Sequence, residues 1–260
     1  MRAAGPVQVP GALNGKAALV TGGGRGIGRG IALALAAAGA AVAVCGRSPE
    51  PLEQTVQDVI ARGGQAKAVQ CDVTDPAALQ ALVADVVAAY GGVNILVNNA
   101  MQIPRGTLLE ISEETVNAAW VSGPLACLRL MRLCHPYLEG GGSVVNVSSG
   151  SSLSPDQPLR GIYAATKASV NAISRAAAVE WGPDGIRVNV LMPFGKSDSV
   201  ARLLENEPGF AAEVLKGTPL GRFGEAEADI GRVVAFLCGP DAGFITGTTI
   251  PVDGGRSYLR

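Results

Sequence analysis

The chain has 260 residues, of which 48% are hydrophobic and 17% are charged, and its net charge is −1 at pH 7. This composition allows a sizeable core and excludes an intrinsically disordered chain. A net charge so close to zero gives no field that would attract nucleic acid or anionic lipid, so we expect neither a nucleic-acid nor a membrane partner.

At the N-terminus, no continuous apolar stretch reaches the length of a signal peptide. Nor does any apolar run reach the roughly 20 residues needed to span a bilayer. We therefore predict a cytoplasmic protein with a flexible tail over residues 1–13 and a single domain over residues 14–260. The cysteines are widely spaced and odd in number, which favours free buried thiols over a disulfide framework or a metal site. They are Cys45, Cys71, Cys127, Cys134 and Cys238.

Short apolar segments alternate with longer, Ala-rich segments of helical pattern along the chain. The predicted strands are 17–21, 41–45, 66–71, 95–98, 143–148, 187–191 and 248–252. The predicted helices are roughly 26–38, 50–62, 76–90, 112–138, 160–181 and 226–238. This alternation predicts an α/β fold with a doubly wound, parallel, seven-stranded sheet in three αβα layers.

The first predicted strand runs into the segment TGGGRGIG, residues 21–28, and then into a helix. Glycines allow a tight turn and let the backbone approach a pyrophosphate, which the helix N-terminus attracts. The glycines that fit this role are Gly22, Gly26 and Gly28, with the spacing GxxxGxG rather than GxGxxG. The segment therefore predicts the phosphate-binding loop of a dinucleotide site.

Arginine stands where a carboxylate usually meets the ribose hydroxyls of NAD. Arg47 follows the second predicted strand, and Arg25 lies in the glycine loop. Two guanidinium groups suit the 2′-phosphate of NADP(H), although two solvated arginines remain the alternative. After the third strand, Asp72 could accept from the adenine amino group, and Asn98 after the fourth could order the neighbouring loop.

A tyrosine and a lysine share one face near the start of the helix over 160–181. Tyr163 and Lys167 are four positions apart, so their side chains can converge. An ammonium close to a phenol favours the ionised phenolate, which makes the tyrosine useful in proton transfer. The pattern YxxxK is weak alone, but here it follows the Ser-rich end of the fifth strand.

Together these motifs resemble the short-chain dehydrogenase/reductase family over residues 15–256, a single-domain, Rossmann-type oxidoreductase family. The motifs are TGGGRGIG, Asp72-Val73, Asn98-Asn99-Ala100, Ser149, YAATK, Arg187-Val188-Asn189-Val190 and Val252-Asp253-Gly254-Gly255. The resemblance implies that Tyr163 is the general acid or base, that Lys167 supports it and holds the nicotinamide ribose, and that Ser149 donates to the substrate oxygen. Ser149 lies 14 positions before Tyr163, one more than the family spacing, so Ser148 and Ser151 remain alternatives.

The resemblance also implies an NADP(H) site. Its predicted residues are Gly22, Gly24, Arg25, Gly26, Ile27, Gly28, Arg47, Cys71, Asp72, Val73, Asn98, Asn99, Ala100, Tyr163, Lys167 and Pro193.

Three positions depart from the family pattern. Met101 and Phe194 each replace a glycine beside the cofactor, and Trp120 occupies the position of a catalytic asparagine. In the family, the main-chain carbonyl of that asparagine holds a water in a proton relay to the lysine. Pro124 has no N–H to pair with the Trp120 carbonyl, so we hypothesise that the proline creates the required helix irregularity and that the carbonyl still holds the relay water. The alternative is a broken relay.

Residues 194–219 interrupt the strand–helix rhythm and predict a substrate lid, with an ordinary surface segment as the alternative. The expected substrate is a small, largely apolar carbonyl or alcohol compound. Apolar surfaces on the helices over 116–134 and 163–181 predict a homodimer or homotetramer, with ordinary burial within the monomer as the alternative. A reductase of C=C or C=N bonds, or a catalytically impaired NADP(H)-binding protein, remains open.

Overall fold

The computed structural model describes residues 11–153, 158–196, 200, 209 and 214–257. Within them, one parallel sheet has the strand order β3-β2-β1-β4-β5-β6-β7. The strands are β1 (Ala17–Thr21), β2 (Ala41–Gly46), β3 (Gln65–Gln70), β4 (Ile95–Asn98), β5 (Ser143–Val147), β6 (Arg187–Pro193) and β7 (Thr249–Val252). The strand order reverses between β1 and β4, where a doubly wound sheet opens a crevice at its carboxyl edge.

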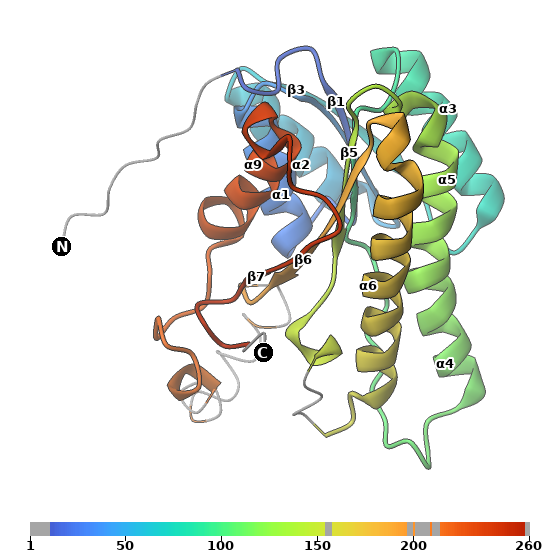
Figure 1. Cartoon of the computed structure of the whole chain (residues 1–260), viewed down its shortest axis with the longest axis vertical. Helices are drawn as coiled ribbons and strands as arrows, with labels where there is room; N and C mark the ends of the chain where they lie inside the picture. Colours follow the sequence, from blue (N-terminus) through green and yellow to red (C-terminus); the bar gives the residue numbers. More distant parts are fainter. Residues whose placement is uncertain (1–10, 154–157, 197–199, 201–208, 210–213, 258–260) are drawn as a thin grey trace.

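Helices cover both faces of the sheet, as Figure 1 shows. On one face lie α1 (Gly26–Ala37), α2 (Pro49–Ala61), the π-helix η4 (Ala226–Gly231) and α9 (Arg232–Cys238). On the other face lie α3 (Pro76–Tyr90), α4 (Glu113–Trp120), the π-helix η1 (Val121–Leu125), α5 (Ala126–Leu138) and α6 (Gly161–Trp181). The predicted three-layer architecture is confirmed.

The central strands are buried on both faces, which explains their continuous apolar sequences. Every residue of β1 and of β5 is buried. One core cluster lies between the sheet and α1, α2 and α9, and the other lies between the sheet and α3, α5 and α6. A parallel sheet covered in this way selects Val, Ile, Leu and Ala at nearly every strand position.

Beyond shifts of one or two residues at the ends of helices and strands, the predicted and observed organisation differ in three places. The single helix expected over 112–138 is α4, η1 and α5, because Pro124 interrupts the α-helical hydrogen bonds. The helix expected over 226–238 starts as a π-helix. Leu13, assigned to the tail from sequence, is 1% exposed, and its N–H donates to Ala38, so the folded part includes residues 11–13. Residues 1–10 and most of the predicted lid, 197–199, 201–208 and 210–213, lie outside the described residues.

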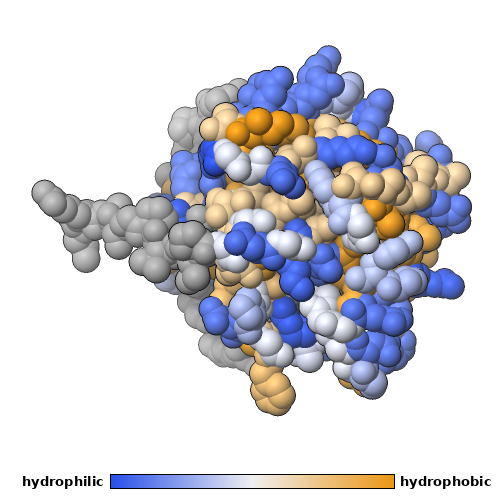
Figure 2. Space-filling view, turned by 90° about the horizontal axis from the view of Figure 1, so that it is seen from above, coloured by the Kyte–Doolittle hydropathy of each residue, from blue (hydrophilic) through white to orange (hydrophobic). Residues whose placement is uncertain are grey.

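All five cysteines are buried and unpaired, as the sequence predicts. Among the described residues, no helix is both long enough and apolar enough to cross a membrane. Figure 2 shows the end of the molecule at the amino ends of the strands, where hydrophilic side chains are interspersed with smaller hydrophobic groups. The predicted site residues lie at the opposite end.

Candidate active site

The loop between β1 and α1 folds tightly against the end of β2. The N–H groups of Gly22 and Gly23 both point at the Cys45 carbonyl, at 2.7 and 3.3 Å. Gly22 has a φ of +66°, in the left-handed region that favours glycine. These contacts hold the glycine loop at the carboxyl edge of the sheet.

Gly28 allows α1 to approach this loop. A Cβ on Gly28 would lie 2.2 Å from the Gly22 carbonyl oxygen and 2.5 Å from Nδ2 of Asn99. Both distances are shorter than any van der Waals contact allows, so only glycine fits here. Gly28 thereby sets the distance between the loop and the start of the helix.

The N-terminus of α1 is open to an anion. Arg25 is the N-cap, and its side chain makes no capping hydrogen bond. The first turn therefore presents main-chain N–H groups and the positive end of the helix dipole. Arg25 and Arg47 are both exposed at this edge, and within the described chain neither guanidinium has a hydrogen bond or an ion pair. This donor set fits a dinucleotide: N–H groups for a pyrophosphate and guanidinium groups for a further phosphate.

Asp72 is held as an acceptor at the end of β3. Its carboxylate accepts from the Thr74 N–H at 2.9 Å and from the Thr74 hydroxyl at 2.8 Å. The main-chain hydrogen bond from Thr74 lowers the pKa of Asp72, and the Thr74 hydroxyl and the charge of Arg47 lower it further. On either side, Cys71 and Val73 are buried and fix the chain direction.

Asn99 and Ala100 fasten the end of β4 to the end of β1. Their N–H groups donate to the Thr21 hydroxyl at 2.9 and 3.0 Å, and the Asn99 side chain donates to the Thr21 carbonyl at 2.9 Å. The crevice between β1 and β4 is therefore lined by a fixed backbone.

Asn98 points the other way, into the core. Its amide donates to Asn146 at 2.8 Å, and Asn146 donates to the Ser174 hydroxyl at 2.8 Å. All three side chains are buried. This chain of hydrogen bonds joins β4 and β5 to α6 beneath the site. The Asn98 side chain therefore ties strands to a helix, whereas Asn99 and Ala100 hold the neighbouring loop.

Tyr163 and Lys167 lie together in the first two turns of α6. Lys167 is 5% exposed, and its Nζ donates to the Val147 carbonyl at 2.6 Å. The same Nζ is 6.0 Å from the centre of the Tyr163 ring. The Arg160 guanidinium is 5.4 Å from that centre. Two cations therefore lie close to the phenol, whose hydroxyl has no hydrogen bond within the described residues.

Among the serines, Ser149 has the geometry of a donor. Its oxygen accepts from the Ser151 N–H at 3.2 Å, which leaves its own proton available. Ser148 is buried and donates to the Lys167 carbonyl at 3.3 Å, so its hydroxyl faces α6. The geometry thus favours Ser149 over Ser148, while Ser151 lies in the same turn and is half-buried.

The turn that carries Ser149 is tied to α6. Asn171 donates to the Ser152 hydroxyl at 2.9 Å, and Ser152 donates to the Ser149 carbonyl at 2.7 Å. A hydroxyl has one proton, so Ser152 gives it to Ser149 and accepts from Asn171. Sequence reasoning missed Asn171 and Ser152, and it also missed Thr21 and Asn146. Their signal is weak, because a buried polar residue on a strand or helix looks the same in sequence whichever residue it contacts.

Met101 packs onto the π-helix rather than into the crevice. A Cβ on Gly123 would lie 3.2 Å from the Met101 sulfur, so the two residues are in contact. The next N–H, of Gln102, donates to the Ser122 hydroxyl at 3.2 Å. The departures at Met101 and at Trp120–Pro124 are therefore neighbours in space.

An irregularity is present at Pro124, as expected. In a π-helix, each carbonyl pairs with the N–H five residues later, so the Trp120 carbonyl faces the N–H of Leu125 instead of the missing N–H of Pro124. The Val121 carbonyl likewise accepts from Ala126. The helix thus accommodates the proline by widening, and the Trp120 carbonyl is not in a regular α-helix.

Phe194 follows Pro193, the last residue of β6, and is held in a small aromatic cluster. Its ring lies 4.7 Å from the Phe223 ring, and the Arg256 guanidinium lies 4.8 Å above it. Arg256 also donates to the Val214 carbonyl at 2.7 Å. Phe194 therefore packs against Phe223 and Arg256, which both come after the predicted lid in the chain.

Comparisons with known proteins identify relatives along nearly the whole chain. A family model described as enoyl-(acyl carrier protein) reductase matches residues 22–257. A tropinone reductase homologue from Arabidopsis thaliana is 37% identical over 247 residues, which cover 94% of this chain and 93% of the relative. A 12alpha-hydroxysteroid dehydrogenase from Clostridium sp. is 35% identical over 254 residues, which cover 94% of this chain and 98% of the relative.

The fold is similar to solved structures of the same class. A short chain dehydrogenase from Burkholderia cenocepacia, in complex with NADP, has a TM-score of 0.87 and 33% sequence identity. The match covers 94% of this chain and 99% of that one.

Proposed function

This chain belongs to the short-chain dehydrogenase/reductase family, and we propose that it is an NADP(H)-dependent oxidoreductase acting on a carbonyl or alcohol carbon. The observation that carries the proposal is the buried Lys167 ammonium, anchored on Val147 and 6.0 Å from the centre of the Tyr163 ring. A desolvated cation beside a phenol whose hydroxyl has no partner in the described chain suits proton transfer to a substrate oxygen.

Each catalytic side chain has one role in this proposal. A nicotinamide cofactor, when bound, would supply or accept the hydride. Tyr163 gives its proton to the substrate oxygen in reduction and removes it in oxidation. Ser149 donates a hydrogen bond to the same oxygen, where negative charge develops. Lys167 places its ammonium beside Tyr163 and stays fixed through Val147.

NADP(H) is favoured over NAD(H) by the two exposed guanidinium groups. Arg25 and Arg47 stand at the edge where the adenosine ribose of a bound dinucleotide would lie, and a 2′-phosphate is a strong partner for guanidinium. The solved NADP complex of the Burkholderia cenocepacia relative supports this choice. Five unpaired cysteines are consistent with the proposed cytoplasmic location.

The surroundings of Tyr163 suit a small, largely apolar substrate. Ile103, Leu153 and Leu159 are 49%, 45% and 48% exposed, and their segments flank the start of α6. Apolar side chains around a few polar groups are typical of small-molecule binding. The names of the tropinone reductase and hydroxysteroid dehydrogenase relatives fit an alicyclic ketone or alcohol.

With Trp120 in place of asparagine, the proton relay to Lys167 is either intact or broken. A carbonyl oxygen has two lone pairs, so the Trp120 carbonyl can face Leu125 and still hold a relay water for Lys167. We propose this arrangement for an active enzyme. The competing proposal, an impaired NADP(H)-binding protein, rests on the absence of an asparagine side chain at this position.

One assay separates the candidate functions. NADPH oxidation is followed with cyclohexanone, 2-cyclohexen-1-one and 1-pyrroline, and the products are identified. Alcohol products support the proposal, whereas saturation of the enone C=C bond favours the activity named by the matching family model. Tight NADPH binding without turnover of any compound favours the impaired protein, and no binding of either pyridine nucleotide contradicts the proposal as a whole.

A helix-to-helix homodimer or homotetramer is part of the proposal. Along α6, the exposed residues Ala165, Ala168, Ala172 and Ala176 form a stripe of small side chains that ends at Val179, which is 80% exposed. Small residues allow two helices to approach closely. Light scattering after size exclusion tests this, because a monomer at micromolar concentration would contradict it.

A further inference from the structure

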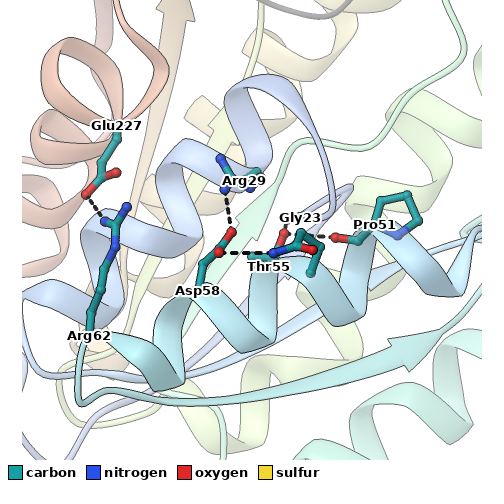
Figure 3. A network of polar contacts seen from close by, with 8 residues as sticks. Gly23, Arg29, Pro51, Thr55, Asp58, Arg62 and Glu227 are labelled. Carbon is teal, nitrogen blue, oxygen red and sulfur yellow. Dashed lines mark hydrogen bonds and ion pairs between the residues drawn. The ribbon is translucent and has the colours of Figure 1, made fainter.

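One face of α2 forms a polar seam against the glycine loop and its neighbours, as Figure 3 shows. The seam consists of Pro51, Thr55 and Asp58 of α2 and of Arg62 at its C-cap, which follow one another at helical spacing. Thr55 contacts the Gly23 carbonyl, Asp58 pairs with Arg29 of α1, and Arg62 pairs with Glu227 of η4 at 2.7 Å. The α2 seam therefore links the phosphate loop to two helices.

Thr55 is the buried member of the α2 seam. It is 0% exposed, and its single hydroxyl proton is shared between two acceptors, the Gly23 carbonyl at 3.1 Å and the Pro51 carbonyl at 3.0 Å. Gly23 is buried too, so water cannot replace the hydroxyl without rearrangement. The ion pairs of Asp58 and Arg62 are partly exposed, and such pairs contribute little.

The contact determines how one peptide unit of the loop is oriented. No peptide bond in the described chain is cis. In a trans peptide the C=O and the following N–H point in opposite directions, so holding the Gly23 carbonyl against α2 turns the Gly24 N–H away from α2. Three successive glycines have the greatest backbone freedom of any sequence, and such a loop needs external contacts to keep one conformation.

Thr55 supplies the contact on the α2 side. On the other side, the Gly22 and Gly23 N–H groups donate to Cys45. A Cβ on Gly24 would lie 3.1 Å from the main-chain N of Leu52, so the loop is also in close packing contact with the first turn of α2. With the hydroxyl removed, the loop keeps its packing and loses the hydrogen bond that fixes the Gly23–Gly24 peptide.

We propose that Thr55 is a positioning residue for dinucleotide binding, which holds the glycine loop in the conformation that receives the pyrophosphate. The inference rests on the proposed function, because it requires this loop to bind NADP(H). Thr55 touches neither cofactor nor substrate in this role and acts through Gly23. Its loss therefore weakens cofactor binding and leaves unchanged the part of the adenosine 2′-phosphate subsite that lies outside the glycine loop, at Arg47 after β2.

The test measures two ligands on matched variants. Dissociation constants for NADPH and for adenosine 2′-monophosphate, which lacks the pyrophosphate, are determined for the wild type, Thr55→Val and Thr55→Ser. Loss of one hydrogen bond of about 1 kcal/mol predicts a roughly 5-fold weaker NADPH affinity for Thr55→Val. Adenosine 2′-monophosphate affinity stays within a factor of two, and Thr55→Ser behaves as wild type.

A matched control removes a buried hydroxyl elsewhere. Ser143→Ala deletes a hydroxyl that donates to the Leu237 carbonyl at the amino end of β5, and it should change neither affinity. Should Thr55→Val not fold, Thr55→Ala removes the same hydroxyl with the same expectation. If Thr55→Val binds NADPH as tightly as the wild type, or loses affinity equally for both ligands, the role of Thr55 is overturned. The proposed function is then unaffected. A wild type without affinity for any pyridine nucleotide overturns the proposed function and this inference with it.

Discussion

The Lys167 ammonium donates to the main-chain carbonyl of Val147 at 2.6 Å, and so joins α6 to the last residue of β5. Lys167 is nearly buried, so the Val147 carbonyl is an internal partner for a charge that water scarcely reaches. A charge-assisted hydrogen bond of this kind is short and directional. It explains how a flexible lysine side chain is held beside Tyr163.

Replacing Lys167 tests the importance of its hydrogen bond to Val147. Lys167→Met keeps most of the side-chain volume but leaves the Val147 carbonyl without its donor. We expect a loss of about 1–3 kcal/mol in the free energy of unfolding and a fall of at least ~100-fold in kcat/KM. Urea unfolding and steady-state kinetics measure the two effects. A variant with wild-type turnover would show that the ammonium is not needed.

Cofactor preference should depend on Arg47. Arg47→Ala removes a guanidinium that has no ion pair within the described chain, so the fold should be unaffected. Loss of one charged hydrogen bond of about 2 kcal/mol predicts a roughly 30-fold weaker NADPH affinity, with NADH affinity unchanged. Lys16→Ala, at the amino end of β1, is the charge-matched control. An equal effect on NADPH and NADH would contradict a 2′-phosphate role for Arg47.

Gly28 should tolerate no side chain. A Cβ there would lie 2.2 Å from the Gly22 carbonyl, so Gly28→Ala must push α1 away from the glycine loop. We expect a lower melting temperature and an NADPH affinity weaker by at least ~10-fold. Gly92→Ala is the control, because a Cβ at Gly92 meets nothing within 4 Å. Equal NADPH affinity in the two variants would show that the loop–helix distance is not critical.

The buried thiols should react in a fixed order. A hydrogen bond from the Cys45 thiol lowers the pKa of Cys71, whereas burial raises the pKa of Cys127 to about 11 and that of Cys134 to about 12. Because the thiolate is the reactive form, Cys71 should be labelled first as pH rises from 7 to 9. NADPH should slow this reaction, since Cys71 adjoins Asp72. The measurement is the release of thionitrobenzoate from dithiobis(nitrobenzoate), with Cys71→Ser as reference. A first reaction that persists in that variant would contradict the order.

The sequence predicted the fold because continuous apolar strands and Ala-rich helices alternate with little ambiguity. It also placed the glycine loop, Tyr163 and Lys167 correctly relative to the strand ends, since parallel strands bring all their carboxyl ends to one edge. It could not predict that Met101 packs on Gly123, or that Asn171 reaches Ser149 through Ser152, because side-chain direction depends on packing between distant segments. At Pro124 the sequence predicts a helix irregularity but not its type. Proline removes a hydrogen bond without specifying what replaces it, and the structure has a π-helix there.

Turnover by Tyr163→Phe tests the central proposal most directly. The substitution removes only the phenolic hydroxyl, which has no hydrogen bond among the described residues, so folding and NADPH affinity should remain within a factor of about three. We predict that kcat on any ketone accepted by the wild type falls by at least ~100-fold. A variant that reduces the ketone at the wild-type rate would contradict the assignment of Tyr163 as the proton donor.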